Sequence, residues 1–114
     1  MRFMLKSKIH HAVVTDWNVD YIWSIFIDED LMERSNIIEY ERVDIVNVSN
    51  WNRWQTYAVP VKKLSWQVIL NWWWALLWKT WDKLIIMSYE LTNETKVNPK
   101  MILVNEKNEF VENL

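Results

Sequence analysis

Tyr21-Ile22-Trp23-Ser24-Ile25-Phe26-Ile27-Asp28 is an apolar run that carries one hydroxyl, Ser24, near its middle. A run this rich in β-branched and aromatic residues is typical of a strand, which we expect over 19–27. In one interpretation, Ser24 is a core residue whose hydroxyl hydrogen-bonds to neighbouring backbone. In the other, Ser24 is reactive and the chain cleaves itself between Trp23 and Ser24.

The rest of the chain alternates short strand-like segments with turns, which predicts a mainly β fold. Strands are expected over 4–15, 43–48, 53–59, 68–70 and 83–89, and in a hairpin that joins 101–104 to 109–111. Turns are expected at 16–18 and 50–52, with Pro60 ending or edging the strand before it and a helical turn at 73–77. Asp28 and the acidic residues after it predict a capped short helix over 28–34. Many short strands with brief helical connectors indicate a small β-barrel.

Composition bounds the class of protein. The 114 residues are apolar-rich throughout, which predicts a single domain over 1–114, and a chain this short gains from association. The net charge is -2 without a basic block, so neither nucleic acid nor an anionic membrane is an expected partner. There is no cysteine, which excludes disulfides and thiolate metal sites. No signal peptide and no apolar run of ~20 residues is recognisable, so we expect a cytoplasmic protein.

Several polar and aromatic residues are candidates for a functional site. His10 and His11 should face opposite sides of a strand, so no metal site is expected. Arg53, Thr56 and Tyr57 form a polar cluster that suits carboxylate binding and proton transfer, or else a solvated face. The run of three tryptophans at 72–74 suits stacking on bases or sugars, or binding to a membrane surface. Because no basic residues are interleaved with it, we expect instead that the run packs in the core or forms an exposed patch.

Tryptophan and glycine usage is abnormal. The chain has 10 Trp and no Gly, whereas average usage predicts about eight glycines. Trp51, Trp66, Trp72 and Trp81 stand beside Asn, Ser or Asp in turn contexts where glycine normally supplies a positive φ. One hypothesis is that these codons are UGA, read as glycine in the source lineage. The alternative is a chain that is truly rich in tryptophan, engineered chains included.

Taken together, these motifs resemble the L-aspartate α-decarboxylase family, pyruvoyl-dependent enzymes that make β-alanine for pantothenate biosynthesis. The likeness runs nearly end to end and fades after Thr92. The segments that carry it are Met4-Leu5-Lys6-Ser7-Lys8-Ile9-His10, Tyr21-Ile22-Trp23-Ser24, Ile27-Asp28-Glu29-Asp30-Leu31, Val43-Asp44-Ile45-Val46-Asn47-Val48, Asn50-Trp51-Asn52-Arg53, Thr56-Tyr57 and Asn71-Trp72-Trp73-Trp74-Ala75.

The resemblance implies a six-stranded double-psi β-barrel, a homotetramer with active sites between subunits, and a proenzyme that cleaves itself before Ser24. The Ser24 hydroxyl would attack the carbonyl of residue 23 to form an ester, with assistance from Thr56. Elimination would leave a dehydroalanine that hydrolyses to a pyruvoyl group, so neither a metal nor pyridoxal phosphate is expected. A maturation factor is a further partner that the resemblance allows.

The resemblance also assigns roles to other residues. The pyruvoyl carbonyl would form a Schiff base with L-aspartate and accept the electrons left as CO2 departs. Tyr57 matches the proton donor, and Arg53 and Lys8 match residues that hold substrate carboxylates. The segment 72–74 aligns with a Gly-Ala-Ala backbone that contacts substrate. Tyr21, His10 and Asn71 match residues that line or support the site.

The chain departs from the family where small residues are expected. Trp23 replaces the glycine before the serine, where a bulky side chain should impede attack on the carbonyl. Trp72, Trp73 and Trp74 should fill a pocket built for aspartate, and Trp51, Trp66 and Trp81 also stand at family glycines, whereas Trp54 matches a family aromatic. We therefore expect a pyruvoyl-dependent aspartate decarboxylase in the natural protein. For the literal chain, the alternative is an uncleaved inactive proenzyme or a non-catalytic β-barrel binding module, and a tryptophan-driven membrane binder is a third possibility.

Overall fold

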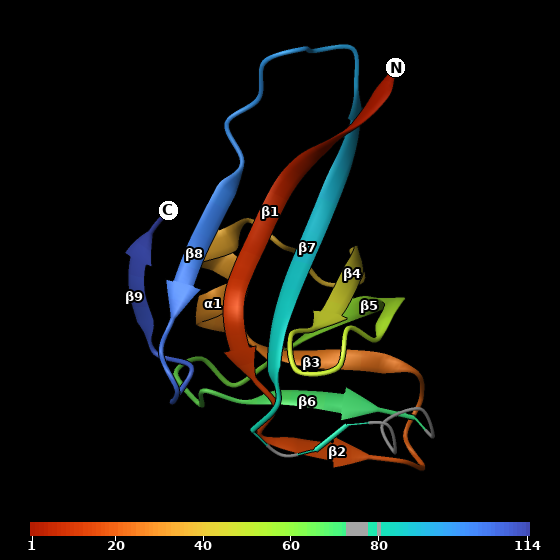
Figure 1. Cartoon of the computed structure of the whole chain (residues 1–114), viewed down its shortest axis with the longest axis vertical. Helices are drawn as coiled ribbons and strands as arrows, with labels where there is room; N and C mark the ends of the chain where they lie inside the picture. Colours follow the sequence, from red (N-terminus) through yellow and green to blue (C-terminus); the bar gives the residue numbers. More distant parts are fainter. Residues whose placement is uncertain (73–77, 80) are drawn as a thin grey trace.

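The computed structural model describes residues 1–72, 78, 79 and 81–114 (Figure 1). The helical turn expected at 73–77 lies outside the described residues, and so do Trp73 and Trp74. The described elements are β1 (Arg2–Val13), β2 (Asp16–Asn18), β3 (Ser24–Asp28), α1 (Glu29–Ser35), β4 (Arg42–Asn47), β5 (Arg53–Val61), β6 (Val68–Asn71), β7 (Lys83–Thr92), β8 (Lys100–Val104) and β9 (Phe110–Asn113). The fold is therefore mainly β with one short helix, as predicted.

The strands follow the order β2-β6-β3-β5-β4-β7-β1-β8-β9. β1 and β7 form a long antiparallel ribbon that rises beyond the other strands in Figure 1, while β2, β3 and β6 cross its lower end. Just past β1, the backbone N–H of Thr15 donates to the carbonyl of Val68 at 2.9 Å, which ties the end of β1 back to β6. This curled sheet is consistent with a small β-barrel.

One hydrophobic core fills the inside of the sheet. On β4, Val43 and Ile45 are buried with the half-buried Asp44 between them, as the alternation predicted for 43–48 requires, but the alternation ends there because Val46 and Asn47 are buried too. α1 packs against β1, β3, β5 and β8 and contributes Leu31 and Met32 to the same core. The core therefore includes Ile25 and Ile27 of β3, the strand that begins with Ser24.

Two expectations about local structure are wrong. Residues 16–18 are a short strand, β2, and not only a turn, because they pair in parallel with β6 (Asp16↔Ile69 to Asn18↔Asn71). The strand expected over 19–27 begins only at Ser24, which pairs with Asn71, the last residue of β6. Because its antiparallel partner ends there, the backbone before Ser24 leaves the sheet.

Asp28 caps α1 as predicted and also anchors the end of β3. Its side chain is fully buried and accepts three backbone N–H bonds, from Asp30 (2.8 Å), Leu64 (2.9 Å) and Trp66 (2.8 Å). These bonds satisfy the carboxylate and fix the loop that follows β5 against the helix. The end of β3 opposite to Ser24 is therefore rigidly held.

The two predicted hairpins are present. β4 and β5 pair from Arg42↔Tyr57 to Val46↔Arg53, and β8 pairs with β9. β5 continues one residue beyond Pro60. Pro60 pairs with Ile27 of β3, at a position where β4 no longer pairs with β5. Pro60 therefore lies at a local edge, where its missing N–H is tolerated.

The four tryptophans predicted to need positive φ all have it: Trp51 (64°), Trp66 (57°), Trp72 (99°) and Trp81 (76°). Their side chains are exposed, from 39% for Trp72 to 78% for Trp51. A residue with a Cβ is disfavoured in this region by roughly 1–2 kcal/mol. These backbone positions therefore favour glycine, which agrees with the turn-context argument; glycine in the natural protein stays a prediction.

Candidate active site

Ser24 lies at the first position of β3 with its side chain buried. Its hydroxyl donates to the carbonyl of Ile22 at 2.9 Å and accepts from Nδ2 of Asn71 at 2.9 Å. Antiparallel pairing places Asn71 directly opposite Ser24, which is why the amide reaches the hydroxyl. The hydroxyl is thus fixed in direction at the point where the chain leaves the sheet.

Two buried polar atoms near this pair lack a hydrogen-bond partner among the described residues. They are Oδ1 of Asn71 and Oγ1 of Thr56. Each such atom costs about 1–3 kcal/mol when no partner is present. Both atoms therefore retain hydrogen-bonding capacity for a further group at the site.

Thr56 and Tyr57 reach the site from β5, which runs parallel to β3 with Ile25 beside Ala58. Counting back one residue on each strand places Tyr57 level with Ser24. Thr56 is buried and points to the opposite face of β5 from the half-buried Tyr57. The predicted polar cluster therefore divides between two faces, with Thr56 toward the interior and Tyr57 outside it.

Arg53 is the first residue of β5 and lies on the same face of the strand as Tyr57. Because β5 runs parallel to β3, Arg53 lies toward the same end of the two strands as the residues that precede Ser24. Its side chain is exposed. Among the described residues, the three ion pairs are Lys6–Glu41, Arg34–Asp30 and Lys63–Glu33. Arg53 and Lys8 take part in none of these pairs, so both cations are available to a carboxylate ligand.

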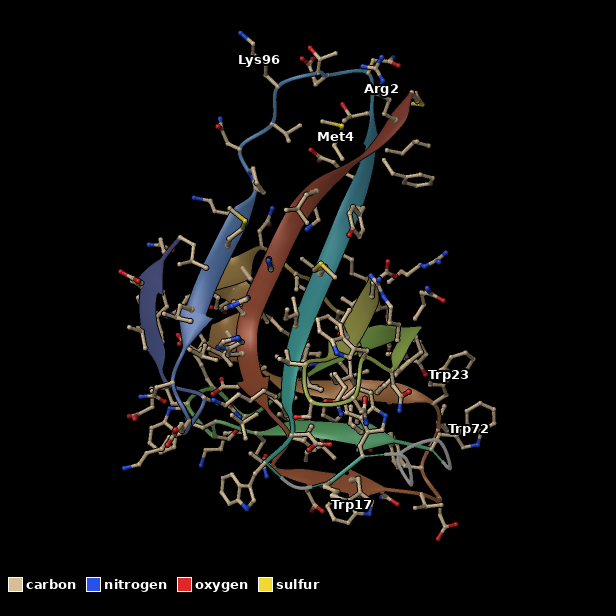
Figure 2. All side chains as sticks on the ribbon, in the orientation of Figure 1. Arg2, Met4, Trp17, Trp23, Trp72 and Lys96 are labelled. Carbon is tan, nitrogen blue, oxygen red and sulfur yellow. The ribbon has the colours of Figure 1, made fainter. Side chains whose placement is uncertain are left out.

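Trp23 and Trp72 flank the Ser24–Asn71 pair and stack on each other. Their ring centroids are 5.3 Å apart with planes inclined by 30°, and the two side chains lie side by side at one edge of Figure 2. The N–H of Trp72 donates to the carbonyl of Asn18 at 2.8 Å, which fixes its backbone. Two indoles therefore cover the place where the chain enters β3.

Tyr21 lies just before this stretch and packs edge-on against Phe26, with centroids 5.2 Å apart. A tyrosine that the sequence did not single out, Tyr40, lies edge-on to Tyr57 at 6.0 Å. No local signal marks it, because Glu39-Tyr40-Glu41 resembles an ordinary charged loop. Only the pairing of β4 with β5 brings it to the site.

Lys8 and His10 are not brought to Ser24 by the sheet order. Both lie on β1, which β7, β4 and β5 separate from β3. Within one chain the expected site residues therefore form two groups. Ser24, Asn71, Thr56, Tyr57 and the Trp23–Trp72 pair make up one group, and Lys8 with His10 make up the other.

The prediction that His10 and His11 face opposite sides is wrong. Their rings stack with centroids 3.9 Å apart and planes at 24°. β1 is bulged here: His11 has a φ of 71°, and the register with β7 shifts between His10 and Ala12. The extra residue turns both rings to one side.

This crowding lowers the pKa of His10 from its ordinary 6.5. Burial is the largest cause, followed by the nearby charges of His11 and Lys8. Nδ1 of His10 also lacks a partner among the described residues. His10 is therefore held neutral at physiological pH.

No group of three or more His, Cys, Asp or Glu in the described part of the chain is arranged to hold a metal. The described helix falls short of the length and apolarity that a membrane span requires. A cavity of about 360 Å³ is lined by Phe3 of β1, Arg42 and Asp44 of β4, and Tyr89 of β7; neither Ser24 nor Asn71 lines it.

Comparison with known proteins gives one consistent result. The family model of aspartate decarboxylase matches residues 1–111. An aspartate 1-decarboxylase of Clostridium botulinum (strain 657 / Type Ba4) is 47% identical over 108 residues, covering 92% of this chain and 85% of the relative. Those of Acetivibrio thermocellus and Thermosipho africanus are 42% and 44% identical over 111 residues, covering 95% and 96% of this chain and 88% and 92% of the relatives. The chain therefore belongs to the aspartate decarboxylase family, whose members are carboxy-lyases.

Proposed function

We propose that the natural protein decarboxylates L-aspartate to β-alanine and CO2, using a pyruvoyl group made from Ser24. The observation that carries this proposal is the buried Ser24 hydroxyl, held between the Ile22 carbonyl and Asn71 where the strand begins. The two bonds fix the direction of the oxygen that would attack the preceding carbonyl. Membership of the family supports aspartate as the substrate.

Self-cleavage requires the Ser24 oxygen to attack the carbonyl carbon of Trp23. The Trp23–Ser24 amide bond breaks, an ester forms, and the nitrogen of Ser24 takes the hydroxyl proton. Elimination then breaks the Cβ–Oγ bond, which frees the carboxylate of Trp23. Hydrolysis of the remaining dehydroalanine releases ammonia and leaves the pyruvoyl group. Asn71 orients the oxygen, and the unpaired Thr56 hydroxyl suits stabilisation of charge on the attacked carbonyl.

The residues present fit the pyruvoyl group and its substrate. The group supplies a carbonyl that acts as an electron sink when an amino acid binds to it. Tyr57 lies level with Ser24 on the adjoining strand and has a hydroxyl able to return a proton to the product. Arg53 lies on the same face with a guanidinium free for a substrate carboxylate.

Lys8 and His10 lie on β1, which does not pair with β3, the strand of Ser24, and is separated from it in the sheet order by β5, β4 and β7. We propose that a second copy supplies them, in a homotetramer whose sites lie between subunits. The charged Arg42 and Asp44, with the exposed Phe3 and Tyr89, give the outer face of β1, β4 and β7 the mixed apolar and charged character of a subunit contact. A cytoplasmic location, a role in pantothenate synthesis and the use of a maturation factor are parts of the same proposal.

The Trp23–Trp72 stack favours the alternative for the literal chain, an uncleaved proenzyme. Attack on the Trp23 carbonyl requires its peptide to rotate, and rotation would break the indole contact. A non-catalytic β-barrel binding module remains the rival from another class.

The test is the intact mass of the purified protein, combined with release of CO2 from L-aspartate. A natural protein with glycine at residue 23 is expected to yield a fragment that begins with a pyruvoyl group at position 24. Ser24→Ala in the same background is the matched control and should stay full length. A glycine-bearing chain that remains whole and releases no CO2 would overturn the proposal in favour of the binding module.

A further inference from the structure

Tyr40 is held in an unfavourable backbone conformation beside β5. Its φ is 68°, the left-handed region that disfavours an aromatic residue. Its N–H donates to the carbonyl of Ala58 at 2.7 Å, and the N–H of Ala58 donates to the carbonyl of Glu41 at 3.0 Å. These two bonds extend the β4–β5 pairing and fix Tyr40 next to Ala58, the residue after Tyr57.

The Tyr40 ring is directed at Tyr57, although 70% of Tyr40 is exposed. The rings meet edge to face, with centroids 6.0 Å apart and planes at 61°. An exposed aromatic side chain at a strained position gains little from burial, so core packing does not explain the contact. Local strain of this kind tends to gather at functional sites.

The chemistry of Tyr40 itself argues against a proton-donating role. The Glu39 carboxylate, by its charge and its hydrogen bond, raises the pKa of Tyr40 above 10.0, and burial, Tyr57 and Tyr21 add to the shift. The phenol therefore stays neutral and is a poorer acid than an ordinary tyrosine. What Tyr40 offers to Tyr57 is its ring.

We propose that Tyr40 is a positioning residue, whose ring edge limits the orientations of Tyr57 beside Ser24. The inference rests on the proposed function, in which Tyr57 returns a proton to the product. Proton return follows substrate binding, so loss of the Tyr40 ring lowers kcat and leaves KM nearly unchanged. The expected loss in kcat is about threefold to tenfold, the rate equivalent of one edge-on aromatic contact.

Two variants separate positioning from structure. Tyr40→Phe keeps the ring and should retain kcat. Tyr40→Asn removes the ring but suits a left-handed backbone, so its thermal midpoint should equal or exceed that of the parent. A purely structural role predicts that kcat and thermal stability fall together, so a lower kcat at unchanged or higher stability would contradict that role.

A second measurement does not need an active enzyme. The chain has 4 tyrosines, so ring-labelled tyrosine gives few NMR signals, and Tyr57→Phe identifies the one from Tyr57. The Tyr57 ring should flip faster in Tyr40→Asn than in the parent or in Tyr40→Phe, whether or not the chain is cleaved.

The outcomes distinguish the two proposals. Activity is measured in the parent with glycine at residue 23; if that chain releases no CO2 from aspartate, the proposed function fails, and the flipping rate still decides whether Tyr40 restrains Tyr57. If Tyr40→Asn leaves both the flipping rate and kcat unchanged, the positioning role is overturned. A rise in KM at constant kcat also overturns it, because that result assigns Tyr40 to substrate binding.

Discussion

Trp23 and Trp72 stack across the β3–β6 pair, one residue outside Ser24 and Asn71 on each strand. The contact joins Trp23, whose peptide bond to Ser24 would be cut, to Trp72, the first residue of the segment expected to contact substrate. Under the proposed function, movement of the Trp23 peptide would therefore also displace Trp72, so that self-cleavage and substrate binding would be coupled through this one pair of rings.

The first prediction concerns the strength of this contact. In a double-mutant cycle with Trp23→Ala and Trp72→Ala, the two residues should show a coupling free energy of about 0.5–1.5 kcal/mol, the usual value of an aromatic pair beyond its area. Urea unfolding of the four proteins supplies the numbers. Strictly additive effects would mean that the two rings do not hold each other.

The second prediction concerns backbone strain at Trp51. Because Trp51 has a φ of 64° and a side chain that is 78% exposed, Trp51→Gly should raise the free energy of unfolding by about 1 kcal/mol. Trp17→Gly is the matched control: Trp17 is also exposed but lies in β2 without positive φ, so glycine should destabilise there. Equal effects at both positions would refute the role of φ.

The third prediction follows from the lowered pKa of His10. At pH above 6.5, His10 is neutral in both the folded and the unfolded chain. As the pH falls below 6.5, the unfolded chain binds a proton first, so stability decreases until the folded pKa is reached. Unfolding measured between pH 5 and 8 should show this slope, and His10→Gln should reduce it. Titration of the imidazole proton resonance gives the folded pKa directly, and a value above 6.5 would contradict the prediction.

The fourth prediction concerns Asp28, which anchors β3. Asp28→Asn keeps one acceptor oxygen but sets an NH2 group against a backbone N–H, so it should destabilise the fold by about 2–3 kcal/mol. The exposed Asp20→Asn is a control that should change stability by no more than about 0.5 kcal/mol. Thermal or urea unfolding of both variants checks this, and equal stabilities would show that the three bonds to Asp28 contribute nothing net.

The structural features that depend only on residues close together in the sequence were predictable. The cap at Asp28 is enough to start a helix, and the residues around Trp51 and Trp66 are enough to require positive φ. Contacts between distant segments were not predictable. β2 exists because β6 pairs with it, and the stack of His10 on His11 depends on a bulge against β7.

The candidate site shows the same division. Spacing alone left Ser24 with two interpretations, and the resemblance chose one of them. The partner of its hydroxyl, Asn71, became visible only with the register of β3 against β6, because neither residue carries a local signal of the pairing. Tyr40 was missed for the same reason, since the β4–β5 pairing alone brings its ring to Tyr57.

The position of β1 in the sheet has a consequence for the product of self-cleavage. Residues 1–23 contribute β1 and β2, and each of these strands pairs only with strands that follow Ser24: β1 with β7 and β8, and β2 with β6. A cut before Ser24 would therefore yield two interwoven peptides that stay together in native buffer and part only on denaturation. The shorter peptide, supplied separately, would provide the strands β1 and β2 that the longer one lacks, so cleavage before Ser24 would make the protein suitable for fragment complementation.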